Sequence, residues 1–173
     1  NETQIAEQRV NETFGTQNIM ALLVPKGDYA SEKALLNRLE TYDQVDYAMG
    51  LSNVEVMDGY TLTDVLTPRQ FSEMTDLDYE LVCLVYAAYA AEQEEYGRIV
   101  GGLDDYAVPL MDMFFFAYDK VEEGYVNLDE EQQADLDDLY VQLSDAQEQL
   151  LGENYTRMLV SLNLPEEGEE TFA

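Results

Sequence analysis

The segment YTRMLVSLN, residues 155–163, alternates apolar and other side chains with the period of a β-strand. One face of this strand carries Met158, Val160 and Leu162. Pro165 follows closely, and proline breaks the pattern because it has no N–H to donate. The glutamates within 166–170 suit the positive end of a helix dipole. We therefore expect a strand at 155–163 and a helix that begins at about Thr171.

A β-α-β unit is predicted near the start of the sequence. The continuous apolar run NIMALLVP, residues 18–25, is typical of a central strand that is buried on both faces. Asp28 or Ser31 can cap the helix that follows. The alternating stretch VDYAMGL, residues 45–51, predicts a second strand. The helix then forms a right-handed crossover between two parallel strands. Before this unit, residues 1–15 have the pattern of a polar helix that ends at Gly15.

Between residues 61 and 152, apolar side chains recur at the three- and four-residue spacing of an α-helix. Thr67, Pro68 and Gln70 combine an N-cap, a first-turn proline and a capping box. The helix that they open continues to the break at GRIVGG, residues 97–102.

Two further helices are expected after that break. Pro109 opens the first, which ends at Gly124. The pattern N-L-D-E at residues 127–130 predicts a capping box for the second, which Gly152 closes. Strands and helices are thus segregated along the chain, and this is the pattern of an α+β fold. We expect one domain over 1–173, with a β-α-β half at 1–56, a helical insertion at 57–152, and a third strand with the start of a second helix at 153–173.

The charge of the chain limits the kinds of partner it can have. Its 37 acidic and 8 basic residues give a net charge of −29. Such a chain is not suited to nucleic acid or to anionic membrane surfaces, both of which attract lysine and arginine. The longest apolar run, residues 81–91, is shorter than a membrane-spanning helix requires.

Side chains that carry chemistry are few. Histidine is absent from the sequence, so histidine-dependent nucleophile systems and histidine metal sites are excluded. Cys83 is the single cysteine, which excludes an intramolecular disulfide, and its apolar surroundings predict a buried, inert thiol. Neighbouring carboxylates such as Asp104 and Asp105 are expected by chance in so acidic a chain. We expect no catalytic site, no metal site and no cofactor.

The stretch PLMDMFFFAY, residues 109–118, is apolar around most of a helix. Such a helix is either buried or presents an apolar surface to a ligand or a neighbouring subunit. Packing in the core is the more common arrangement for methionine and aromatic side chains. The candidate contacts to a hydrophobic substrate or an interface are Met111, Phe114, Phe115 and Phe116.

Several stretches resemble the first extracytoplasmic segment of MMPL-type exporters of the RND superfamily. They are FGTQNIMALLVPKGDYASEKALLNRLE at 14–40, V-x-x-A-M-G-L at 45–51, LTPRQF at 66–71 and RMLVSLNLPEEGEETF at 157–172. The last two are similar to Gram-positive members. The resemblance extends over most of the chain in order, and it is weakest across the helical insertion.

The resemblance implies a fold. In the family this segment is a ferredoxin-like porter subdomain, β-α-β-β-α-β, with strand order 4-1-3-2 and helices inserted before the third strand. The sequence would then be a piece of a longer protein that stops before the second helix is complete and before the fourth strand. Strand 18–25 would keep an open edge, which either another copy or the N-terminal segment is expected to cover.

The resemblance also implies a function. The domain would belong to a proton-driven exporter of hydrophobic or lipid-like molecules, at the extracellular face of the cell membrane. It would guide substrate and transmit movement without catalysis. Its partners would be the transmembrane helices and the second extracytoplasmic domain of the parent chain, a hydrophobic small molecule or lipid, and another copy through strand 18–25. The alternative is a secreted or surface-anchored module that binds a ligand or protein.

Overall fold

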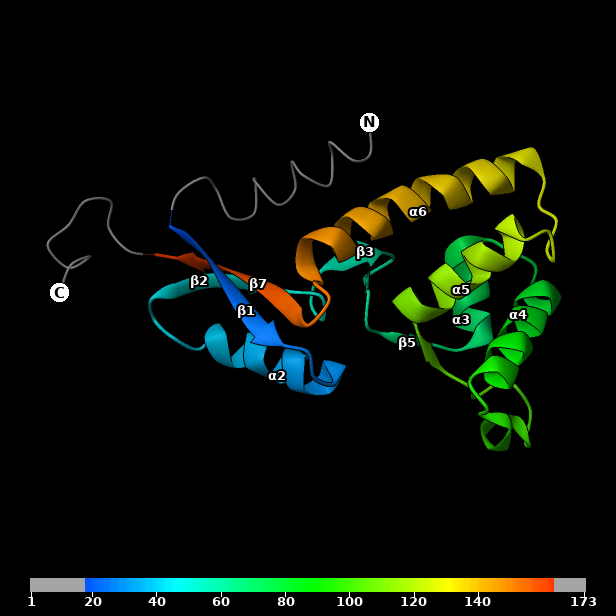
Figure 1. Ribbon diagram of the computed structural model, residues 1–173, viewed down its shortest axis with the longest axis horizontal. Coiled ribbons are helices and arrows are strands. Elements are labelled where there is room, and N and C mark those ends of the chain that lie inside the picture. Colours follow the sequence, from blue (N-terminus) through cyan, green and yellow to red (C-terminus); the bar gives the residue numbers. More distant parts are fainter. Residues whose placement is uncertain (1–17, 164–173) are drawn as a thin grey trace, which may run out of the picture. The chain divides into compact units, whose positions relative to one another are not determined.

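The computed structural model describes residues 18–163. The chain divides into two compact units. Asn1–Val54 and Ser144–Ala173 form the first, here called the sheet unit, and Glu55–Leu143 form the second, the helical unit. Figure 1 shows the elements of both. The fold is α+β, as the sequence predicts, with short antiparallel sheets and five α-helices in the described residues.

The sheet unit contains three strands and one helix. In chain order they are β1 (Ile19–Pro25), α2 (Tyr29–Leu39), β2 (Val45–Met49) and β7 (Tyr155–Leu162). The order in the sheet is β1-β7-β2, and β7 is antiparallel to both neighbours. The strand that comes last in sequence therefore lies in the middle. Because α2 connects β1 to β2 with β7 between them, its apolar face can cover one side of the sheet (Figure 1).

The core of the sheet unit lies between α2 and the sheet. Its fully buried members are Leu36, Ala48, Met158 and Val160. Leu22 and Val24 of β1 pack against them. Met158 and Val160 were expected on one face of the strand at 155–163, and both are indeed buried together.

The prediction that 18–25 is a central strand buried on both faces is wrong. β1 is an edge strand within the described residues, and Leu23 is 64% exposed. A run of apolar residues shows that a segment can be buried, but the positions of its neighbours decide whether it is. Here β7 pairs with both β1 and β2 and so takes the central position.

The helix after β1 begins as the sequence predicts. The side chain of Asp28 accepts a hydrogen bond from the backbone N–H of Ser31 at 2.7 Å. The Ser31 hydroxyl donates to the same carboxylate at 2.9 Å. These hydrogen bonds lower the pKa of Asp28, because they stabilise its ionised form.

The remaining helices of the described residues lie wholly or mostly in the helical unit. They are α3 (Pro68–Thr75), α4 (Tyr79–Glu92), a 3₁₀ turn η1 (Tyr96–Ile99), α5 (Leu110–Glu122) and α6 (Glu130–Leu150), whose last residues belong to the sheet unit. Four short strands pair in two antiparallel ladders that the sequence did not predict, one a hairpin and one between segments far apart in sequence. They are β3 (Glu55–Met57) with β4 (Tyr60–Thr61) and β5 (Val65–Leu66) with β6 (Val108–Pro109).

Local signals set some helix ends correctly. The capping box at Thr67 and Gln70 is confirmed, with Pro68 as the first residue of α3. Gly124 follows the end of α5 with φ +84°, a conformation that glycine adopts readily.

Two other helix limits were predicted wrongly. The helix from Thr67 does not continue to 97–102, because Asp76 adopts a left-handed conformation with φ 57° and separates α3 from α4. The capping box of α6 is formed by Asp129 and Gln132, two residues later than the expected start at Asn127.

The predicted helices ending at Gly15 and beginning at about Thr171 lie outside the described residues, as does the segment expected to cover β1. Within 18–163, no helix is both long enough and apolar enough to cross a membrane.

Candidate functional site

Helix α5 carries the four residues that the sequence singles out as hydrophobic contacts. Met111 is 3% exposed and Phe114 is fully buried. Phe115 and Phe116 are partly exposed. The first two side chains therefore pack in the core of the helical unit, and only the other two reach its surface.

The side of α5 that carries Phe115 belongs to an aromatic cluster with α6. The rings of Tyr118 and Tyr140 stack at 4.2 Å with an interplanar angle of 19°. Phe115 meets Tyr140 edge-on at 5.8 Å. The Tyr118 hydroxyl donates to Asp137 at 2.9 Å. Burial is the largest cause that raises the pKa of Tyr118, and this hydrogen bond to a carboxylate raises it further. The cluster joins two helices, and the hydrogen bond between Tyr118 and Asp137 reinforces this contact.

Phe116 packs towards α4. Its ring meets Tyr89 edge-on at 5.2 Å, and the Lys120 ammonium lies 5.0 Å from its centroid. Lys120 also donates to Glu92 at 2.9 Å, which raises the pKa of the lysine. Side chains of α4 and α5 therefore cover part of this ring.

An apolar cavity lies among the helices of this unit, next to α5. The volume of this cavity is about 20 Å³. The lining residues are Phe71, Leu77, Leu81, Val82, Val85, Tyr86, Ala117, Val121, Val126 and Leu136. None of the four expected contact residues lines it. Its size is that of about one water molecule, so a hydrophobic ligand would enter only if the helices moved apart.

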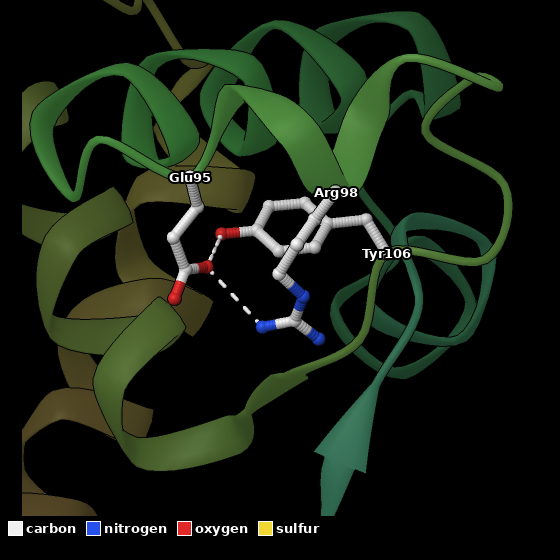
Figure 2. A network of polar contacts seen from close by, with 3 residues as sticks. All are labelled: Glu95, Arg98 and Tyr106. Atoms are coloured by element: carbon white, nitrogen blue, oxygen red, sulfur yellow. Dashed lines mark hydrogen bonds and ion pairs between the residues drawn. The ribbon is translucent and has the colours of Figure 1, made fainter.

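A polar network closes the segment between α4 and β6, and Figure 2 shows its three members. Glu95 accepts hydrogen bonds from the Tyr106 hydroxyl at 2.6 Å and from Arg98 at 3.2 Å. The Arg98 guanidinium lies over the Tyr106 ring, 5.0 Å from its centroid. Burial and the Glu95 carboxylate both raise the pKa of Tyr106. Because every charged group has a partner within the network, it is suited to holding the segment in place rather than to proton transfer.

A second polar pair fixes the start of α4. The Tyr79 hydroxyl donates to Asp104 at 2.7 Å, and the Arg69 guanidinium lies 4.4 Å from the centre of the Tyr79 ring. The hydrogen bond to Asp104 is the main cause that raises the pKa of Tyr79 to about 12. Tyr79 therefore stays protonated at neutral pH and links α4 to the loop that contains Asp104.

The carboxylates that the sequence suggests as candidates, Asp104 and Asp105, lie in different surroundings from Asp112. Burial raises the pKa of Asp112, in the first turn of α5. Asp104 and Asp105 are both exposed. Across 18–163, no three cysteine or acidic side chains converge on a point where they could hold a metal ion. Cys83 is half-buried, not fully buried as the sequence predicts.

We did not predict from the sequence that Glu32, in the sheet unit, is buried. Glu32 of α2 is 5% exposed, and its Oε1 accepts a hydrogen bond from the Thr156 hydroxyl of β7 at 2.6 Å. Its Oε2 has no hydrogen-bond partner among the described residues. A signal was present, because Glu32 lies four residues before the core residue Leu36 and so shares its helix face.

No protein-family model, curated protein or solved structure matches this chain.

Proposed function

We propose that this chain is the extracytoplasmic, porter-like domain of a proton-driven exporter of hydrophobic or lipid-like molecules, of the MMPL type in the RND superfamily. The strand order β1-β7-β2 carries the proposal. In the ferredoxin-like arrangement 4-1-3-2, the third strand lies between the first and second and is antiparallel to both. The three strands of the sheet unit have that relation.

The position of the insertion also supports this function. The chain leaves the sheet after β2, forms the helical unit over Glu55–Leu143, and returns as the central strand β7. The polar networks around Tyr106 and Tyr79 tie helices and loops together within that unit. A module of this kind transmits movement as a packed body and guides substrate between domains. Its partners are the membrane helices and the other extracytoplasmic domain of the parent chain.

A binding module without a transport role is the second candidate. The apolar cavity beside Ala117 and Val121 favours it, since small-molecule sites are lined mainly by apolar and aromatic side chains, as this cavity is.

Surface labelling and efflux measured on the intact gene test the first proposal. Val100 is 85% exposed, so a Val100→Cys variant in a Cys83→Ser background provides one accessible thiol within residues 1–173, and the same background without Val100→Cys is the control. We expect a membrane-impermeant maleimide to label it on intact cells. Cells without the gene should accumulate more of a hydrophobic fluorescent dye, and the intact gene should restore efflux that depends on the proton gradient. Labelling only after lysis, or unchanged dye accumulation, would contradict the exporter.

A further inference from the structure

The outer side of α4 is apolar although it meets water. The run 81–91 carries no charged residue, in a helical unit that holds 22 of the 37 acids of the chain. Leu84, near the middle of the run, is 69% exposed. Because an α-helix advances 100° per residue, four half-buried side chains lie on the same side as Leu84. They are Leu81, Ala87, Ala88 and Ala91. We call these five residues the outer face of α4.

The inner side of α4 has its own packing partners. Its buried residues are Val82, Val85, Tyr86 and Ala90. The Tyr86 ring meets Phe71 of α3 edge-on at 6.0 Å, and the Tyr86 hydroxyl donates to the carbonyl of Leu66 at 2.7 Å. These contacts fix which side of α4 points to the core. The core therefore does not account for the apolar outer face, and an apolar surface of this kind is typical of a place where another protein binds.

The charges around the outer face are acidic. Glu80 lies on the same side of α4, one turn before Leu84, and Glu92 and Glu94 follow the apolar run. All three glutamates are exposed. Each base of the helical unit is engaged by a neighbouring side chain. Arg69 lies over the Tyr79 ring, Arg98 bonds to Glu95, and Lys120 bonds to Glu92. A partner that approaches α4 therefore meets an apolar strip with a negative rim.

We propose that the outer face of α4 binds an amphipathic helix of a separate, basic protein. Leu84 packs between apolar side chains of the partner helix, and the small alanines beside it let the two helix axes approach closely. Lysine or arginine at the edges of the partner's apolar stripe lies opposite Glu80 and Glu94. A second copy of this chain does not fit the face, because it brings the same acids against one another. An anionic bilayer is disfavoured for the same reason.

The size and charge of the outer face determine how the contact should behave. One helix on three turns of another buries less than the ~1,200 Å² of total surface typical of stable complexes, so we expect a weak and reversible association. Because charges of opposite sign meet at the rim, added salt should weaken the association. A cross-link formed in cells that carry the intact gene suits a contact of this strength.

Photo-cross-linking in the intact protein tests the contact. The photo-reactive residue p-benzoylphenylalanine replaces Leu84, and in the control it replaces Val100, which is 85% exposed. We expect a cross-linked product from position 84 and none from position 100. Mass spectrometry of the product should identify a segment of another protein with apolar residues at three- and four-residue spacing and more basic than acidic residues. The absence of a product, equal products at both positions, an acidic segment, or a cross-link to lipid, to the parent chain or to a second copy would overturn the inference.

A charge reversal tests the acidic rim. With the photo-reactive residue kept at position 84, Glu80→Lys should lower the yield of cross-linked product about threefold or more, because an attraction at the rim becomes a repulsion. Glu131→Lys is the matched control, since it makes the same change of net charge on an exposed residue of α6. Equal yields from the two variants, or a yield that rises with added salt, would contradict the basic partner. The labelling and efflux measurements do not depend on this contact, so the two proposals fail separately.

Discussion

The carboxyl group of Glu32 is the clearest example of how one residue affects this fold. It lies inside the sheet unit, 5% exposed, with Thr156 as its hydrogen-bond donor and with Oε2 unpartnered within 18–163. Removal of one member of a buried polar pair leaves the other without its partner. Removal of both can be nearly neutral.

We therefore expect Thr156→Val to lower the free energy of unfolding by about 1–3 kcal/mol. The double variant Glu32→Leu/Thr156→Val should recover a large part of that loss. Thr41→Val is the control, because the Thr41 hydroxyl bonds to the carbonyl of Arg38 on an exposed surface. Urea denaturation followed by circular dichroism measures these three variants and the single variant Glu32→Leu. A double variant that is as unstable as the sum of its single variants would contradict the pairing.

Asp112 provides a prediction about pH. Burial raises its pKa in the folded state above the ordinary value, so the folded protein holds this proton more tightly than the unfolded chain does. The protonated carboxyl group of Asp112 therefore stabilises the folded state at low pH. This contribution to the free energy of unfolding is lost as the pH rises through the folded-state pKa.

We expect Asp112→Asn to be more stable than the natural chain at neutral pH, because the buried charge is removed. The difference should shrink as the pH falls below the folded-state pKa of Asp112, where the natural carboxyl group is also neutral. Denaturation curves of both proteins at neutral and acidic pH test this. Asp105→Asn, at an exposed carboxylate, is the control. If the difference in stability between Asp112→Asn and the natural chain grew as the pH fell, it would contradict this prediction.

At the scale of single elements, the start of α3 depends on two side chains close in sequence. Thr67 accepts a hydrogen bond from the N–H of Gln70 at 3.3 Å, and Gln70 accepts one from the N–H of Thr67 at 2.9 Å. The sequence predicts this box because a cap needs no distant contact. The end of α3 at Asp76 is different, since its left-handed conformation has no unambiguous local signal.

Thr67→Ala should cost about 1 kcal/mol of stability, the usual effect of losing an N-cap. Thr75→Ala is the matched control in the same helix, because the Thr75 hydroxyl bonds only to the carbonyl of Phe71, one turn earlier. We expect the control to stay within about 0.5 kcal/mol of the natural protein. Thermal denaturation of the two variants compares them directly. Equal effects would show that the cap is not what stabilises this end.

At the scale of the whole molecule, the two units differ in continuity and in charge. The helical unit is a single stretch, Glu55–Leu143, whereas the sheet unit is built from both ends of the chain. The helical unit also holds 22 of the 37 acidic residues and 3 of the 8 basic residues. Most of the net charge therefore lies in one unit.

We expect a fragment of residues 55–143 to fold by itself, because its core is contained within that range. Core members include Phe71, Tyr86, Tyr106, Met113 and Phe114. Its stability should rise with salt, since screening weakens repulsion among its acids. Circular dichroism and thermal denaturation at several salt concentrations measure both properties. A fragment without cooperative unfolding would contradict the division into two units.

The candidate contacts at α5 show what a sequence pattern can and cannot predict. The apolar stretch from Met111 to Phe116 predicts a helix that packs on more than one side, and α5 is such a helix. Which of its side chains remain exposed depends on where α4 and α6 pass. That is why Phe114 is buried while Phe115 reaches the surface beside Tyr140.

The sequence by itself determined the α+β class, the strands near 18–25, 45–51 and 155–163, and the caps at Asp28 and Thr67. These features depend on side-chain period and on bonds between residues close along the chain. The residue patterns alone left it to the tertiary structure to decide that β7 is the central strand, that β1 lies at the edge, and that Glu32 is buried against Thr156, although the family resemblance implied the strand order. Each of these depends on contacts between residues far apart in sequence, and no local pattern records which distant segment lies alongside.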